Sequence, residues 1–337
     1  MTLLKRAVLL VAMAAVIIAP SLAARAEVGE VILGQQFGTF YVPLMAMERL
    51  KLVEKHLAAQ GLAETKVRWV KLSGPAALTD SMLAGTTHFA GQGVPSLALL
   101  WDRTKGGIGV KGLGNICDGN LWLNTRNPNI KSIRDFTEQD RIAVPSLKIS
   151  GAAIYLQMQA EKEWGPGQHT RLDHLMVPMS HPDAVAALLN PVHEINTHFA
   201  TVPFHGIEIR AGLRTITTAY EIIGGQAGTL AFTTTETFRR ENPKTYAAVA
   251  AAFDEGLNWA NADKRQAARL YREMANERKL SEDDIYALVT APDFAWSKTP
   301  RKVEQTAKFM FRTGTLKSEP ASWKDLYMPE VHGLAGD

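Results

Sequence analysis

Two Ser-Gly pairs stand where a predicted strand passes into a predicted helix. Ser73-Gly74 follows the apolar run KVRWVKL, and Ser150-Gly151 precedes the helical run AAIYLQMQ. Each serine can simply cap its helix, or the free N–H groups of the helix N-terminus can bind an anion. Capping is the simpler interpretation for either pair alone. Because the pairs hold matching positions, we favour one small anion shared between two opposed helix starts.

The other predicted strand ends are also rich in uncharged hydrogen-bonding and aromatic residues. They contain Ser, Thr, Gln, Gly and Phe, and they lack the carboxylate clusters of acid–base catalysis. We therefore predict no catalytic residue. The further ligand-binding candidates at these ends are Gln36, Phe37, Thr39, Phe40, Gln92, Gly93 and Phe204.

Histidines raise two further hypotheses. His181 opens a predicted helix at a strand end, so it can donate to an anion or be structural. A protonated His181 donor would make affinity fall as pH rises through its pKa. His193, His198 and His205 are spaced along one segment, but His198 lies within a predicted strand and His205 follows it, so the three need not converge and we predict no metal site.

The sequence offers little support for a bound cofactor or a nucleophilic enzyme. The run GLGNICDGN lacks the G-x-G-x-x-G spacing, and neither a P-loop nor G-x-S-x-G occurs. Cys117 is the only cysteine, which excludes an internal disulfide and fits a small core residue. We predict no cofactor.

The first 26 residues have the pattern of a cleaved secretory signal peptide. Lys5 and Arg6 precede an apolar run, and Ala24-Arg25-Ala26 is a small-x-small cleavage site. This predicts a periplasmic protein. The segment holds three of the 37 basic residues and no acidic one, which leaves 34 basic against 34 acidic residues. The basic pI therefore gives no argument for nucleic-acid binding, and we predict none.

Strand and helix patterns alternate along the rest of the chain, which predicts an α/β fold with mostly parallel sheets flanked by helices. The pattern restarts after the first four strands. We expect lobe 1 to comprise residues 27–119 and 224–337, and lobe 2, residues 120–223, to be inserted into it. Two crossings between lobes form a hinge, and the cleft between the lobes is the expected ligand site.

The order of these motifs resembles the periplasmic substrate-binding components of ABC transporters of the nitrate/sulfonate/taurine/bicarbonate type. The resemblance covers nearly the whole chain after residue 26, and it rests on QQFGTFY, EKHL, VKLSGPAALTDSMLAGTTHFAGQGVPSLALL, LNTRNPNIKSIRDF, DRIAVP, SGAA and PDAVAALL. It implies a type II periplasmic-binding fold, a small-molecule anion as ligand and an ABC permease as partner. The contacts that it implies fall on Gln36, Ser73, Gly74, Gln92, Gly93, Ser150, Gly151 and Phe204.

The resemblance leaves the solute open, and two alternative functions remain. A sulfonate or carboxylate is favoured over nitrate or bicarbonate, with Lys148 the only basic candidate in the strongest loops. The alternatives are an exported enzyme of the thiamine-pyrimidine-synthesis branch, whose members carry a cysteine-rich motif, and a ligand-presenting sensor. One cysteine argues against the enzyme. We expect a monomer.

Overall fold

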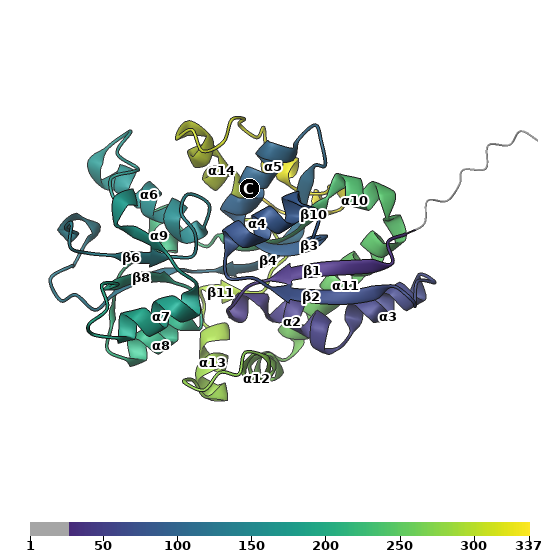
Figure 1. The fold of residues 1–337 in the computed structure, drawn as a ribbon, viewed down its shortest axis with the longest axis horizontal. Coiled ribbons are helices and arrows are strands. Elements are labelled where there is room, and N and C mark those ends of the chain that lie inside the picture. Colours follow the sequence, from purple (N-terminus) through teal and green to yellow (C-terminus); the bar gives the residue numbers. More distant parts are fainter. Residues whose placement is uncertain (1–26) are drawn as a thin grey trace, which may run out of the picture.

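The computed structural model describes residues 27–337 as two α/β lobes lying side by side (Figure 1). The predicted signal peptide, residues 1–26, lies outside the described residues. None of the helices in residues 27–337 is both long enough and apolar enough to cross a membrane. The two-lobed architecture with helix-flanked sheets agrees with the sequence prediction.

Lobe 1 is built on a six-stranded sheet. Its strand order is β11-β4-β10-β3-β1-β2, and β2, β1 and β3 are parallel. Strand β10 is antiparallel to both of its neighbours, β3 and β4. The strands are β1 (Glu30–Gln35), β2 (Lys66–Lys71), β3 (Phe89–Gly93), β4 (Val110–Gly119), β10 (Gly228–Thr235) and β11 (Phe294–Ala295).

Helices cover both faces of this sheet, and each face buries its own apolar cluster. On one face Leu44, Val53 and Phe253 pack into the first cluster. On the other face Leu97 and Met310 belong to the second. The helices of the first face are α2 (Val42–Arg49), α3 (Leu52–Ala59), α11 (Pro243–Ala262) and α12 (Lys264–Met274), and those of the second are α4 (Pro75–Leu83), α5 (Val94–Thr104) and α14 (Val303–Arg312). The short helix α10 (Glu236–Glu241) follows β10.

Lobe 2 is smaller and is built on a five-stranded sheet with the order β7-β6-β8-β5-β9. Here β7, β6 and β8 are parallel, and β5 is antiparallel to β8 and β9. Its strands are β5 (Trp122–Thr125), β6 (Ile142–Val144), β7 (Met176–Pro178), β8 (Thr197–Ala200) and β9 (Arg214–Thr218). Its helices are α6 (Gly151–Trp164), α7 (His181–Leu189), α8 (Phe204–Arg210) and α9 (Ala219–Ile223).

The antiparallel strands β5 and β10 are the first strands after the two crossings. The chain leaves lobe 1 at the carboxyl end of β4, so it enters lobe 2 from the side of the cleft and β5 must run away from it. Strand β10 re-enters lobe 1 in the same way. The sheets are therefore mixed where the sequence pattern alone predicts parallel strands.

The two crossings are hydrogen-bonded to each other at the hinge. The side chain of Asn120 accepts from the Tyr220 N–H at 3.0 Å, and the Thr229 hydroxyl accepts from the Gly119 N–H at 3.1 Å. In the second crossing Gly224 has a left-handed φ of 81°, which glycine adopts without strain. We propose that the lobe boundaries lie at these two crossings, between residues 119 and 120 and between residues 223 and 224. Each sheet lies wholly within one of the lobes that these boundaries define.

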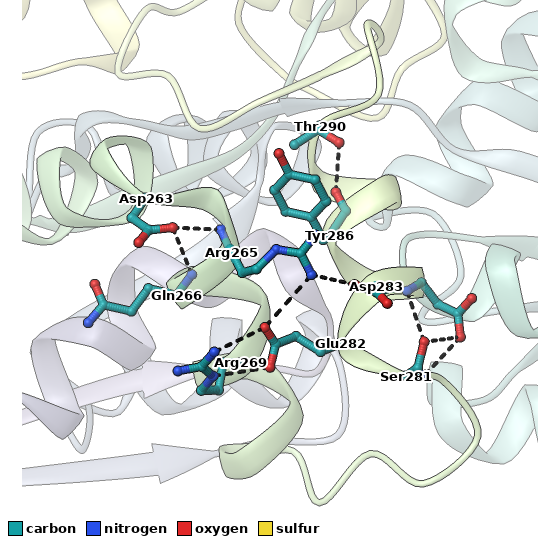
Figure 2. Close-up of polar contacts among 10 residues, drawn as sticks. Asp263, Arg265, Gln266, Arg269, Ser281, Glu282, Asp283, Tyr286 and Thr290 are labelled. Carbon is teal, nitrogen blue, oxygen red and sulfur yellow. Dashed lines mark hydrogen bonds and ion pairs between the residues drawn. The ribbon is translucent and has the colours of Figure 1, made fainter.

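A helical hairpin of α12 and α13 (Glu282–Val289) projects from lobe 1 beside lobe 2 (Figure 1). Figure 2 shows the ion pairs that hold α13 on α12: Arg269 with Glu282 at 3.0 Å, and Arg265 with Asp283. The Arg265 guanidinium also lies 4.2 Å from the centre of the Tyr286 ring. This network fixes the position from which α13 reaches lobe 2.

Candidate functional site

A small cavity of about 50 Å³ lies between the lobes, at the carboxyl ends of β1, β3 and β6. Seven of the predicted residues line this interlobe cavity: Gln36, Phe37, Phe40, Gly93, Ser150, Gly151 and His181. The lining holds no Lys, Arg, Asp or Glu side chain. Polar recognition here must therefore come from backbone groups, hydroxyls, one amide and one imidazole.

The N-terminus of α6 supplies the free backbone donors of the cavity. Ser150 caps the helix, because its hydroxyl accepts from the Ala153 N–H at 3.2 Å and donates to the Ser146 carbonyl at 2.6 Å. The N–H groups of Gly151 and Ala152, in the first turn, have no carbonyl within the helix to bond. Both residues line the cavity. These two N–H groups, with the positive end of the helix dipole behind them, suit an anion.

The N-terminus of α4, the second predicted helix start, is already occupied. Pro75 at the start of the helix has no N–H, and the Ala76 N–H donates to the Ser146 hydroxyl of lobe 2 at 3.3 Å. Gly74 faces lobe 2 so closely that a Cβ there would lie 2.9 Å from the Pro145 carbonyl oxygen. The expected pair of helix starts is present, but in this structure the Ala76 N–H of α4 binds the other lobe, whereas Gly151 and Ala152 at the start of α6 line the cavity.

The two predicted serines have different environments, and this gives a testable contrast. Ser73 is exposed and outside the cavity lining, whereas Ser150 is buried and holds the first turn of α6. We expect Ser150→Ala to weaken ligand binding several-fold and to lower stability by about 1 kcal/mol through loss of the cap. Ser73→Ala should change neither. Titration calorimetry and thermal melts would measure both effects, and a Ser73→Ala effect as large as that of Ser150→Ala would contradict this assignment.

Two other predicted residues have side chains engaged within the protein. The Gln92 amide lies in the core of lobe 1, between the Thr79 hydroxyl at 3.3 Å and the Met82 sulfur at 2.9 Å. The Thr39 hydroxyl donates to the Val202 carbonyl of lobe 2 at 3.2 Å. Neither residue lines the cavity. We therefore assign Gln92 to packing and Thr39 to contact between the lobes.

Aromatic rings form much of the apolar wall of the cavity. Phe37 is partly exposed, Phe40 is buried, and both line the cavity beside Tyr41. The Tyr41 hydroxyl donates to the Gly91 carbonyl at 3.2 Å. Phe204 lies outside the lining but stacks on His181, with ring centres 5.3 Å apart.

His181 is the imidazole that lines the cavity, and one of its ring nitrogens contacts a buried residue of lobe 2. Its Nδ1 lies 2.8 Å from Nε2 of the buried His198. Burial and the neighbouring His198 hold the pKa of His181 well below its ordinary value. His181 is therefore neutral at physiological pH, and it can donate to a ligand only from a neutral ring. This differs from the protonated donor considered from the sequence.

Sequence reasoning missed several residues that line the cavity. Pro75 and Ala152 adjoin the two Ser-Gly pairs, and Thr201 lies at the same strand end as Phe204, so a wider window around these signals would have included them. The remaining lining residues lie on the crossings and on neighbouring elements, where only the tertiary fold brings them together: Tyr41, Leu121, Pro145, Thr229 and Leu230.

The lobes touch each other around the cavity. The Ser96 hydroxyl on α5 donates to the Ile149 carbonyl of lobe 2 at 3.0 Å. At the edge, Arg210 on α8 forms a two-pronged ion pair with Asp284 on α13, at 2.7 and 2.6 Å. Because donors of one lobe meet acceptors of the other, this arrangement is a closed one.

Other sequence candidates lie away from the cavity. Cys117 is fully buried, as expected of a core residue. Lys148 is exposed and does not line the cavity. Within residues 27–337, no group of three or more His, Cys, Asp or Glu side chains is placed to hold a metal ion.

Comparison with known proteins identifies the fold. No protein-family model matches the chain, and no curated protein matches its sequence. Solved structures do match. The alkanesulfonate-binding protein SsuA from Xanthomonas axonopodis pv. citri, bound to MOPS, has a TM-score of 0.69 at 12% identity, over 90% of this chain and 99% of that one.

Two further structures agree. The periplasmic aliphatic sulphonate binding protein SsuA from Escherichia coli has a TM-score of 0.63 at 16% identity, over 90% of this chain and 99% of that one. The periplasmic nitrate-binding protein NrtA from Synechocystis PCC 6803 has a TM-score of 0.66 at 16% identity, over 89% of this chain and 84% of that one. The chain therefore has the two-lobed fold of periplasmic sulfonate- and nitrate-binding proteins.

Proposed function

We propose that the protein is an extracytoplasmic solute-binding protein that closes its two lobes on a small anion and delivers it to an ABC permease. The observation that carries the proposal is the start of α6, where Gly151 and Ala152 line an interlobe cavity and their N–H groups have no carbonyl partner within the helix. The similarity to binding proteins over nine-tenths of the chain supports it.

The lining of the cavity narrows the class of solute. A lining without Lys or Arg offers hydrogen bonds and a helix dipole but no ion pair. Such a site suits a ligand with a single negative charge spread over several oxygens better than a ligand with two negative charges. Phe37, Phe40 and Tyr41 suit an apolar or aromatic body next to that charge. We therefore propose a monoanionic sulfonate or carboxylate with an organic body.

Binding is favoured over catalysis because of the groups that the cavity offers. Its titratable lining residues are His181, whose ring is held neutral, and Tyr41, whose hydroxyl already has a backbone partner. An exported enzyme of the thiamine-pyrimidine branch is the alternative, but the chain's one cysteine is buried. Transport and ligand presentation to a receptor would use the same cavity.

A thermal-shift panel on the purified protein tests the proposal. The panel holds aliphatic and aromatic sulfonates and carboxylates, nitrate, bicarbonate and pyrimidines. A ligand at about 100 times its Kd adds about 2.7 kcal/mol of stability, which raises the melting midpoint by about 5–10 °C in a domain of this size. We expect hits confined to organic monoanions that stay chemically unchanged. Consumption of a hit would indicate an enzyme, and hits confined to cations or neutral compounds would contradict the anion site.

A further inference from the structure

A buried carboxylate lies behind the histidine of the cavity. Glu208 on α8 is fully buried, and its Oε1 is 2.5 Å from His198 Nδ1. Its Oε2 accepts from the Asn124 side-chain amide at 2.7 Å. The Nε2 of His198 is in turn 2.8 Å from Nδ1 of His181, which lines the cavity. Glu208, His198 and His181 thus form a continuous relay from the core of lobe 2 to the ligand site.

The described elements around Glu208 bring no Lys or Arg to neutralise it. Strands β5 and β6 carry no titratable side chain. On β9, Arg214 donates to the carbonyls of Asn127 and Ile130, and on α8, Arg210 pairs with Asp284.

The remaining titratable neighbours do not neutralise Glu208 either. On α7, Asp183 accepts from the Ser180 hydroxyl. His205 lies beside Asn124, and burial lowers its pKa to about 4, so it is neutral. An ionised carboxylate buried without a cation is strongly disfavoured. The imidazole in direct contact with Glu208 is His198, and it is the group positioned to carry the compensating proton.

A proton on His198 determines the state of His181. An imidazolium donates from both ring nitrogens, so His198 donates from Nδ1 to Glu208 and from Nε2 to His181. The Nδ1 of His181 must then be the acceptor. A neutral His181 in this position carries its proton on Nε2.

We propose that Glu208, acting through His198, fixes His181 as a neutral Nε2–H donor toward the cavity, so that the site selects solutes that present an oxyanion acceptor there. The inference rests on the proposed function for its ligand, but the protonation pattern belongs to the ligand-free protein. Glu208 and His198 are positioning residues, and His181 is the residue that contacts the solute. A solute with an N–H donor at the same point would meet a second donor and be rejected.

Nitrogen-15 NMR of the ligand-free protein, labelled at its histidines, tests the relay directly. Long-range proton–nitrogen correlations distinguish the two neutral tautomers from the imidazolium. We expect His198 protonated on both nitrogens and His181 protonated on Nε2 alone, at pH 7. A neutral His198, or a proton on Nδ1 of His181, would overturn the proposal.

A matched pair of variants connects the relay to binding. Glu208→Gln removes the buried charge, and Glu138→Gln removes the exposed partner of His174, which lies 2.9 Å away. We expect only Glu208→Gln to remove the imidazolium signals of His198. It should also weaken binding of methanesulfonate about tenfold, the effect of one hydrogen bond to a charged group.

The two proposals can fail separately. If the histidine spectra show the expected protonation states but the protein does not bind methanesulfonate, the relay is supported and the proposed solute class is wrong. If the protein binds methanesulfonate but His198 is neutral, the proposed function is supported and the relay is contradicted. If Glu208→Gln does not fold, the wild-type spectrum still decides.

Discussion

Replacing Gly151 by proline is expected to weaken anion binding about ten- to a hundredfold, the effect of losing one hydrogen bond to a charged ligand. Proline removes the Gly151 N–H and puts its ring where the anion would sit. The helix itself should tolerate the change, because proline is favoured at the first helical position. The preceding Ser150 has φ −79° and ψ 149°, the extended backbone that a residue before proline requires.

Gly151→Ala is the matched control. A Cβ at this position would lie 3.5 Å from the Tyr155 ring and 3.9 Å from Leu121, which are ordinary contacts. The alanine variant keeps the N–H, so its affinity should stay within about threefold of wild type. Titration calorimetry with the best solute of the panel measures both variants, and thermal melts confirm that both fold. Equal affinities for the proline and alanine variants would mean that the anion does not bind at the start of α6.

The fold was predictable because its signals are local and repeated. Strand-to-helix alternation along the chain predicted the two lobes, and glycines after Tyr220 marked the second crossing. The direction of β5 and β10 was not predictable in this way, because it depends on which side of each sheet the chain enters. A strand pattern has the same period in either direction.

The candidate site was predictable only in part, for a related reason. Ser150-Gly151 and Ser73-Gly74 look alike in sequence, but Pro75 and the approach of Ser146 distinguish them in space. Gln92 sits at a strand end, yet its side chain points into the core toward Met82. A strand end tells which residues are near the cleft, and the tertiary packing decides which of their atoms face it.

The relay of Glu208, His198 and His181 also could not be predicted from the sequence. In the sequence, His198 is one of three histidines spaced along one segment, and their spacing does not identify a partner for His198. Its partner is Glu208, ten residues later, which the turn into α8 brings within 2.5 Å. Contacts of this kind depend on how a strand and the following helix pack, and no residue pattern in the sequence records them.

Adding a Cβ at Gly74 is expected to weaken ligand binding by hindering closure of the lobes. In the closed arrangement this Cβ would lie 2.9 Å from the Pro145 carbonyl oxygen, across the lobe boundary. The backbone φ of Gly74 is −174°, which any residue adopts. The substitution therefore adds no backbone strain within lobe 1. Overpacking of this kind destabilises a structure by about 1–3 kcal/mol. Because the destabilisation arises only in the closed state, it weakens the apparent affinity for the solute by the same free energy, which is roughly 5- to 150-fold.

Two substitutions separate closure from helix capping, because Gly74 is also the N-cap of α4. Alanine is a poorer N-cap than glycine and serine a better one, but both add the same Cβ. We expect Gly74→Ala and Gly74→Ser both to bind the solute more weakly, although their effects on α4 are opposite. Gly29→Ala is the control, since a Cβ there meets nothing within 4 Å. Small-angle scattering at a fixed solute concentration near the wild-type Kd should show less compaction in both Gly74 variants than in the control. If only the alanine variant binds weakly, capping of α4 and not closure is the cause. If neither does, the lobes do not meet at Gly74 when the solute is bound.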